Sequence, residues 1–276
     1  MPQISLAMVG LPRVGEVGCP WVDARGFFDW CRAAGYAAVQ LDGTAPGLRA
    51  RELDGSARRD IAASLARRGL GLSGIDLFVP SADLVDLARV DRALGAIVAA
   101  MELMADLRSV CIGDPGVGVV LPAKLEATTR SELVRMGQRL GVAVVDFAWK
   151  SEHVGIHGGG VIVQGIDPAI AGASEGAGKA NEAIAAAMGA SSASGRIGGA
   201  RLCESGGIGR VEVGADASSR LDVLAYAAGL GAAGFRGAMV WDGRGLAKPV
   251  DAAQRGAATY ARMLGPLGAD VGGGRA

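Results

Sequence analysis

Short apolar segments alternate with helical patterns along most of the 276-residue chain, and this alternation predicts an α/β protein folded as a (β/α)8 TIM barrel. Eight candidate strands are rich in valine, isoleucine and leucine and read as near-continuous apolar runs. Such runs are typical of parallel strands buried on both faces. About seven helices fit between the strands, as a barrel of this length requires. A doubly wound open sheet is the alternative.

The candidate strands are spaced regularly, and each is bounded by glycine, proline or aspartate. They are expected at residues 3–8, 38–41, 71–77, 109–112, 142–147, 161–164, 200–203 and 237–241. Residues 148–160 are polar and glycine-rich where a helix should separate the fifth strand from the sixth. We therefore expect one helix to be missing or short there.

Apolar residues recur at helical spacing between the strands. The clearest patterns cover residues 27–34, 90–101, 133–140, 221–228 and 250–264. Thr129 and Glu132 have the spacing of a capping box that would open the third of these helices. Gly229, Gly231 and Gly234 match a dinucleotide-binding pattern, but they end a helix and precede a strand, whereas that motif follows a strand and opens a helix.

Composition narrows the class of protein. Lysine plus arginine and aspartate plus glutamate each number 28, so we expect neither nucleic acid nor a membrane as partner. The four cysteines form no closely spaced pair, no apolar run is long enough to cross a bilayer, and no signal segment opens the chain. We expect a cytoplasmic single domain over residues 1–267 with a flexible tail at 268–276, a small-molecule partner and possible homo-oligomers.

Acidic residues end or follow several of the candidate strands. Because the active site of a TIM barrel lies at the carboxyl ends of its strands, these acids are expected to share one rim. Converging carboxylates repel one another, and a divalent cation or a shared proton relieves the repulsion. The alternative is that each acid caps a helix or terminates a strand. The residues are Asp42, Asp76, Asp114, Asp146, Glu204 and Asp242, with Glu152, His153, His157 and Asp167 nearby in sequence.

The two histidines and a short basic loop are further candidates. His153 and His157 lie four residues apart, but Gly155 between them argues against a helical metal motif, so a ligand or catalytic role competes with a surface loop. Arg49 and Arg51 follow a Pro-Gly turn and suit a substrate carboxylate or phosphate. A solvated charged loop is the alternative. Arg244 is a similar candidate.

The order of segments resembles the xylose isomerase-like TIM barrel superfamily, the sugar phosphate isomerase/epimerase group. The resemblance is clearest from FFDWCRAAGYAAVQLDGT to GLSGIDLFVP and continues through LGVAVVD, GARLCES and GFRGAMVWDGRG. It implies an isomerase or epimerase that moves a proton next to a carbonyl, often with a divalent metal such as Mn, Mg, Zn or Co held by two glutamates, an aspartate and a histidine.

Carried over by position, the resemblance implies a metal site of Asp146, Asp167 and Asp242. Asp146, Glu204 and His153 are then the catalytic candidates, and the substrate would contact Asp42, Arg49, Arg51, Asp76 and Arg244. The chain departs from the family at the seventh strand, where ARLCE at 200–204 has no histidine, and after the third, where PSADLVD has none either.

These departures keep a second hypothesis open, in which a catalytically degenerate barrel binds a small molecule or serves as a structural protein. An endonuclease of the same superfamily would need a cluster of histidines and a basic groove, and the sequence has neither. Whether the chain is an enzyme therefore depends on whether the strand-end acids meet around a metal.

Overall fold

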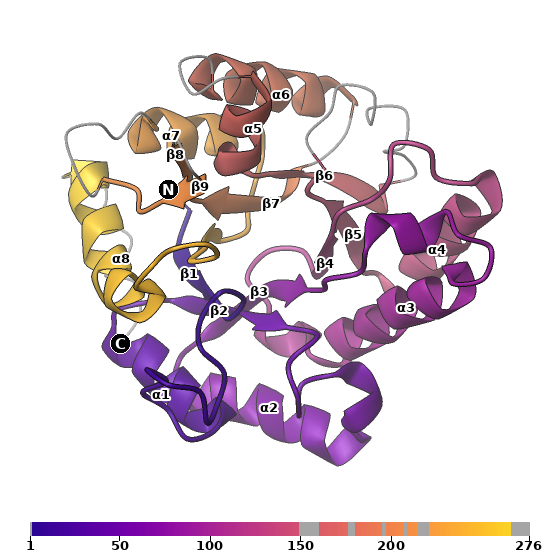
Figure 1. The fold of residues 1–276 in the computed structure, drawn as a ribbon, viewed down its shortest axis with the longest axis horizontal. Coiled ribbons are helices and arrows are strands. Elements are labelled where there is room, and N and C mark those ends of the chain that lie inside the picture. Colours follow the sequence, from indigo (N-terminus) through magenta and orange to yellow (C-terminus); the bar gives the residue numbers. More distant parts are fainter. Residues whose placement is uncertain are drawn as a thin grey trace.

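The computed structural model describes residues 2–148, 160–175, 180–194, 197–206, 209–214 and 221–265. Its centre is a closed barrel of parallel strands in the order β1-β10-β7-β6-β5-β4-β3-β2 (Figure 1). This confirms the predicted TIM barrel. The strands are β1 (Ile4–Ala7), β2 (Ala38–Asp42), β3 (Gly71–Asp76), β4 (Gly116–Val119), β5 (Ala143–Asp146), β6 (Ile162–Ile166), β7 (Ile197–Leu202) and β10 (Met239–Trp241).

Helices surround the barrel and cover the outer faces of its strands (Figure 1). They are α1 (Ala24–Ala33), α2 (Gly55–Arg67), α3 (Val90–Asp106), α4 (Ala127–Leu140), α5 (Pro168–Glu175), α6 (Ala180–Ser194), α7 (Val223–Ala232) and α8 (Pro249–Leu264). Three single-turn helices are η1 (Ala50–Glu52), η2 (Ser81–Leu84) and η3 (Arg108–Val110). None of the helices in the described ranges combines the length and the apolar character needed to cross a membrane.

A small antiparallel hairpin follows β7 and is separate from the barrel sheet. It consists of β8 (Glu204–Gly206) and β9 (Gly209–Val211). The hairpin brings Arg210 back over the carboxyl end of β7, where that side chain contacts Cys203. It was not anticipated from the sequence.

Two sequence-based expectations about elements were wrong. The fourth strand is β4 and not residues 109–112, because Cys111 makes only an isolated bridge to Leu72 and the chain then turns at Gly113, whose φ is +78°. The glycines of β4 hid its strand signal. The capping box also fails, since α4 begins at Ala127 and Thr129 lies inside the helix. The expected break between the fifth and sixth strands, within 149–159, and the tail at 268–276 lie outside the described residues.

One aromatic ring fills the middle of the barrel lumen. Phe147, which follows β5, lies so close to Gly118, Gly165 and Gly199 that a Cβ on each would come within 2.9, 2.5 and 2.9 Å of its ring atoms. Any side chain at these three positions would occupy the space of the ring, so the strand glycines permit Phe147 to enter the lumen. Below it, toward the amino ends of the strands, remains a cavity of about 30 Å³ that Gln40 helps to line. Phe147 thus forms the floor of the opposite, carboxyl end.

Candidate functional site

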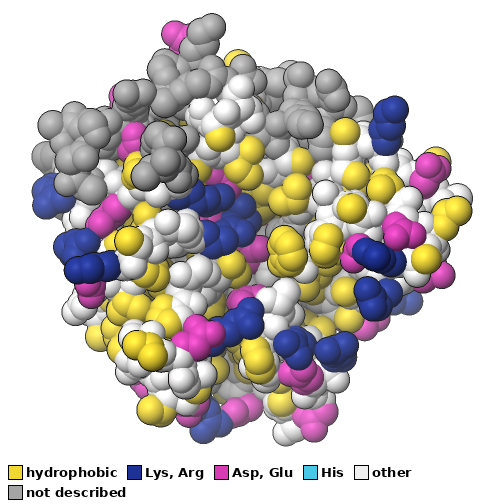
Figure 2. Space-filling model, viewed as in Figure 1, with side chains coloured by type: hydrophobic (Ala, Val, Ile, Leu, Met, Phe, Trp, Pro, Cys, Tyr) yellow, Lys and Arg dark blue, Asp and Glu magenta, His cyan; other side chains and the backbone are white. Residues whose placement is uncertain are grey.

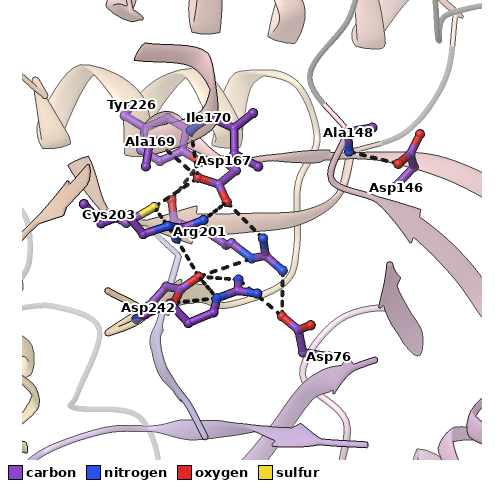
Figure 3. Close-up of polar contacts among 12 residues, drawn as sticks. Asp76, Asp146, Ala148, Asp167, Ala169, Ile170, Arg201, Cys203, Tyr226 and Asp242 are labelled. Carbon is purple, nitrogen blue, oxygen red and sulfur yellow. Dashed lines mark hydrogen bonds and ion pairs between the residues drawn. The ribbon is translucent and has the colours of Figure 1, made fainter. Parts of the chain in front are cut away.

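Four buried ionisable residues meet at the carboxyl end of the barrel (Figure 3), and one of them, Arg201, lies over the Phe147 ring. Asp76 is the last residue of β3, Asp167 follows β6, Asp242 follows β10, and Arg201 lies within β7. All strands of a parallel barrel end on the same rim, so acids at these positions are brought together although they lie far apart in sequence. The exposed fraction of each residue is 4% or less. We call these four residues the lumen cluster.

Arg201 lies at the centre of this cluster. Its Nη2 donates to Asp76 Oδ2 at 2.6 Å, and its Nη1 donates to Asp167 Oδ2 at 2.9 Å. Its Nε lies 3.6 Å from Asp242 Oδ2 and has no hydrogen-bond partner. The guanidinium carbon is 3.7 Å from the centre of the Phe147 ring. The Arg201 guanidinium is thus held over an aromatic face, with carboxylates around its edge.

Two further arginines cover the cluster from the solvent side. Arg210 Nη2 donates to Asp167 at 2.7 Å and its Nη1 donates to Asp242 at 2.8 Å. Arg244 Nε donates to Asp242 at 3.0 Å, and its Nη2 lies 3.4 Å from Asp76. The side chains of Arg210 and Arg244 are 17% and 29% exposed, against 3% for Arg201. Figure 2 shows basic side chains gathered over the barrel centre, with hydrophobic ones around them.

The arginines keep the two most buried acids ionised. Burial alone would raise the pKa of Asp167, but the charges of Arg201 and Arg210 outweigh it and hold this pKa far below its usual range. The pKa of Asp242 is likewise lowered, because the hydrogen bonds and charge of Arg244 overcome the effect of burial. Asp167 and Asp242 are therefore ionised at neutral pH, and their lowered pKa values make them weak bases.

A buried thiol contacts the same network. Cys203 Sγ donates to Asp167 Oδ1 at 3.2 Å and accepts from Arg210 Nη1 at 3.3 Å. Burial, reinforced by the negative charge of Asp167, raises the pKa of Cys203 well above its usual value. The thiol is thus protonated at neutral pH and serves as a hydrogen-bond donor. In this state it is not a nucleophile, because only the thiolate is nucleophilic.

The acids expected to share a metal do not converge on a common point. Asp167 and Asp242 both face arginines, whereas Asp146 is turned away from them and accepts from the backbone N–H groups of Leu121 and Ala148 at 3.0 and 2.9 Å (Figure 3). Within the described residues, no three histidine, cysteine, aspartate or glutamate side chains are placed to hold a metal ion. Moreover, the Arg201 guanidinium stands between Asp76, Asp167 and Asp242. This donor set does not fit a divalent cation.

The other predicted site residues are spread more widely. Asp42 accepts from Thr44 N at 2.8 Å and from Thr44 Oγ1 at 2.6 Å. Glu204 accepts from the backbone N–H of Leu221 at 3.2 Å. Asp76 belongs to the lumen cluster and Arg244 covers it from the solvent side, and their contact with a substrate stays a prediction. His153 lies outside the described residues.

Arg49 and Arg51 line a separate cavity on the helix side of β3. Arg49 is fixed there by its own loop, where Nε donates to the Thr44 carbonyl oxygen and Nη1 donates to Glu52, both at 2.9 Å. Arg49 and Arg51, which were predicted to contact the substrate, therefore line a different cavity from the lumen cluster.

Sequence reasoning missed Arg201, Arg210 and Cys203 as members of the site. A signal for Arg201 was present, because an arginine inside the apolar run of β7 must find partners when that run is buried. Arg210 had no such signal, since it reaches the cluster only through the β8–β9 hairpin.

Comparison with known proteins finds likeness at the level of structure. No protein-family model matches the sequence, and no curated protein matches it. An L-ribulose 3-epimerase structure matches with a TM-score of 0.67 at 17% identity, over 96% of this chain and 95% of that one. A D-psicose 3-epimerase from Clostridium cellulolyticum H10 matches with a TM-score of 0.65 at 10% identity, over 95% and 98% of the two chains.

A third structure is a xylose isomerase-like TIM barrel protein from Mycobacterium smegmatis in complex with magnesium, with a TM-score of 0.59 at 10% identity, over 95% of this chain and 98% of that one. At such identities the likeness establishes the fold. The chain thus has the fold seen in xylose isomerase-like TIM barrel proteins, sugar epimerases among them, and in this chain arginines stand between the strand-end acids.

Proposed function

We propose that this chain binds a small carbohydrate-like molecule at the carboxyl end of its barrel, and that arginines take the part that a divalent metal would play. The observation that carries the proposal is the Arg201 guanidinium, enclosed by Asp76, Asp167 and Asp242. Proteins of the same fold include epimerases of L-ribulose and D-psicose. A polyhydroxylated ligand at the same end of this barrel would find charged donors and acceptors fixed in advance.

The solvent-side arginines support binding of a ligand with a negative charge or several hydroxyls. Arg210 and Arg244 are partly exposed above the cluster, and a guanidinium offers five donors in a planar fork. Carboxylate and phosphate groups match that fork with two parallel hydrogen bonds. A sugar acid or sugar phosphate would therefore gain more from this site than a neutral sugar.

The catalytic version of the proposal is an isomerase or epimerase that moves a proton next to a carbonyl, with Asp146, Glu204 and His153 as its acid and base candidates. Likeness to sugar epimerases favours it. The state of the two central acids counts against it, because Asp167 and Asp242 have lowered pKa values and are poor proton acceptors. We therefore place binding first and proton transfer second.

A single set of measurements separates the two. Protein dialysed against EDTA is titrated calorimetrically with pentuloses, hexuloses, their phosphates and the matching sugar acids, and each mixture is incubated in D2O and followed by NMR. We expect saturable binding that EDTA does not change, with no deuterium entering next to the carbonyl. Deuterium incorporation that appears only after a divalent metal is restored would establish the isomerase instead, and no binding of any ligand would refute both.

A matched pair of variants locates the site. Arg244→Gln removes one charged donor from the solvent side of the cluster and should weaken binding about tenfold, which corresponds to the loss of one charge-assisted hydrogen bond. Arg32→Gln changes an exposed arginine of α1 and should leave the affinity unchanged. Equal affinities for the two variants would place the ligand elsewhere.

A further inference from the structure

A second cavity lies outside the barrel, between β3 and α3, and has a volume of about 350 Å³. Side chains alternate along a strand, so Asp76 points into the lumen while Ile75 and Leu77 point toward the helix layer and line this cavity. The volume is within the range of small-molecule sites, roughly 300–1,000 Å³. The cavity and the lumen cluster therefore occupy opposite faces of one strand.

The walls of this cavity are apolar, and small residues of α3 form one of them. The exposed Ala96, the half-buried Ala99 and the buried Ala100 line it together with Leu103. Phe78 also lines the cavity, although 75% of its surface is exposed. An apolar occupant would remove this apolar surface from water, which is favourable.

The remaining side of the cavity is basic. Arg49 and Arg51 both line it, on the loop that precedes α2. Glu52 accepts from Gly47 N at 2.7 Å and from Arg49 Nη1 at 2.9 Å, and these contacts, with that of Gly47 the stronger, lower its pKa and keep it ionised. The charge of Arg49 is thus compensated within the loop. Arg51 is exposed and acts on Glu52 only through its charge, without a hydrogen bond or ion pair in the described part of the chain.

We propose that this cavity binds a small amphipathic anion, an aliphatic chain that ends in a carboxylate, with the chain against α3 and β3 and the carboxylate on Arg51. Charge complementarity selects an anion, because the side chains that line the cavity include Arg49 and Arg51 and no acid, and Arg51 stands outside the Arg49–Glu52 pair. The apolar walls select an aliphatic body over a sugar. This ligand is chemically distinct from the one proposed for the lumen cluster, so either site can be present without the other.

Octanoate is a suitable probe, with acetate as the head group alone and octanol as the tail alone. Calorimetric titration of the full chain should show saturable octanoate binding, at least tenfold weaker octanol binding and no acetate binding. Equal affinities for octanoate and octanol would remove the role of Arg51 and overturn the proposal. The absence of octanoate binding would also overturn it.

Two variants test the position of the ligand. Ala99→Leu fills the cavity and should abolish octanoate binding, whereas Ala63→Leu, at an exposed alanine of α2, should not change it. Arg51→Gln should weaken octanoate about tenfold and leave octanol unchanged, with Arg32→Gln as its control. Octanoate binding that persists in Ala99→Leu would place the ligand elsewhere.

Other occupants of the cavity give different results. A dimer that forms with rising concentration and is lost in Ala99→Leu would assign the cavity to a second copy of the chain and contradict the proposal. Sedimentation of the wild type and of Ala99→Leu distinguishes this case. Sugar binding at the lumen cluster should be the same in Ala99→Leu as in the wild type, which keeps the outcomes for the two sites independent.

Discussion

The two faces of β3 border regions of opposite character. On the lumen side, Asp76 joins a network of arginines and carboxylates, and the Phe147 ring leaves a cavity of only about 30 Å³ beneath it. On the helix side, alanines of α3 leave about 350 Å³ with apolar walls. The lumen face is thus a network of buried charges packed against Phe147, whereas the helix face is an apolar-walled space with arginines along one side only. A substitution should act by electrostatics and overpacking on the first face, and by filling space on the second.

Removing the central cation should have the largest effect. Arg201→Met leaves three buried carboxylates without it, and loss of one partner from a buried ion pair costs about 3–5 kcal/mol. Urea unfolding measures the loss. Arg25→Met is the matched control, since its pair with Asp60 is 58% and 50% exposed and should contribute at most about 1 kcal/mol. Similar losses in both would mean that the cluster is not an electrostatic centre.

Acid should weaken the lumen face selectively. The pKa values of Asp167 and Asp242 are lower in the folded than in the unfolded chain, so they stabilise the fold above about pH 4. That stability is lost as pH falls through the folded pKa values, at about 1.4 kcal/mol per unit of difference. Unfolding curves from pH 7 to pH 2 should show a loss that begins below about pH 4. The slope of the free energy of unfolding against pH should shrink in Arg210→Gln, because Asp167 and Asp242 lose a neighbouring cation, and it should persist in Ala99→Leu. An unchanged slope in Arg210→Gln would contradict this.

Added volume should be costly in the lumen. In Gly165→Ala the new Cβ would stand 2.5 Å from the Phe147 ring, and overpacking of this kind costs about 1–3 kcal/mol. Gly95→Ala is the control, because that exposed glycine of α3 has no atom within 4 Å of a new Cβ and should stabilise the helix by about 0.5–1 kcal/mol. Thermal unfolding of both variants gives the comparison. A neutral Gly165→Ala would show that Phe147 can move aside.

Added volume should be favourable on the helix side. Ala99→Leu places an apolar side chain in the outer cavity and should raise the free energy of unfolding by about 0.5–2 kcal/mol, the usual range for cavity filling. Ala63→Leu at an exposed position should change it by less than about 0.5 kcal/mol. Denaturant midpoints of the two variants measure the difference. A destabilised Ala99→Leu would indicate that the cavity is too narrow for the added atoms.

The barrel could be predicted well because its signals are local. Apolar runs such as β2 and β5, and the helical spacing in α3 and α8, are written in neighbouring residues. The error at β4 arose from a local signal, because its glycines weakened the strand pattern. The reason for those glycines is not local, since the Val145 and Phe147 side chains approach the β4 backbone from elsewhere in the barrel.

The sequence by itself determined which acids end strands, since Asp76, Asp146 and Asp242 follow directly from the apolar runs. Only the tertiary structure decided what those acids face. Asp146 bonds to neighbouring backbone N–H groups, whereas Asp76 and Asp242 meet an arginine from a third strand. The physical reason is that closure of the barrel sets these distances, and no spacing along the chain encodes which side chain of β7 points into the lumen between them.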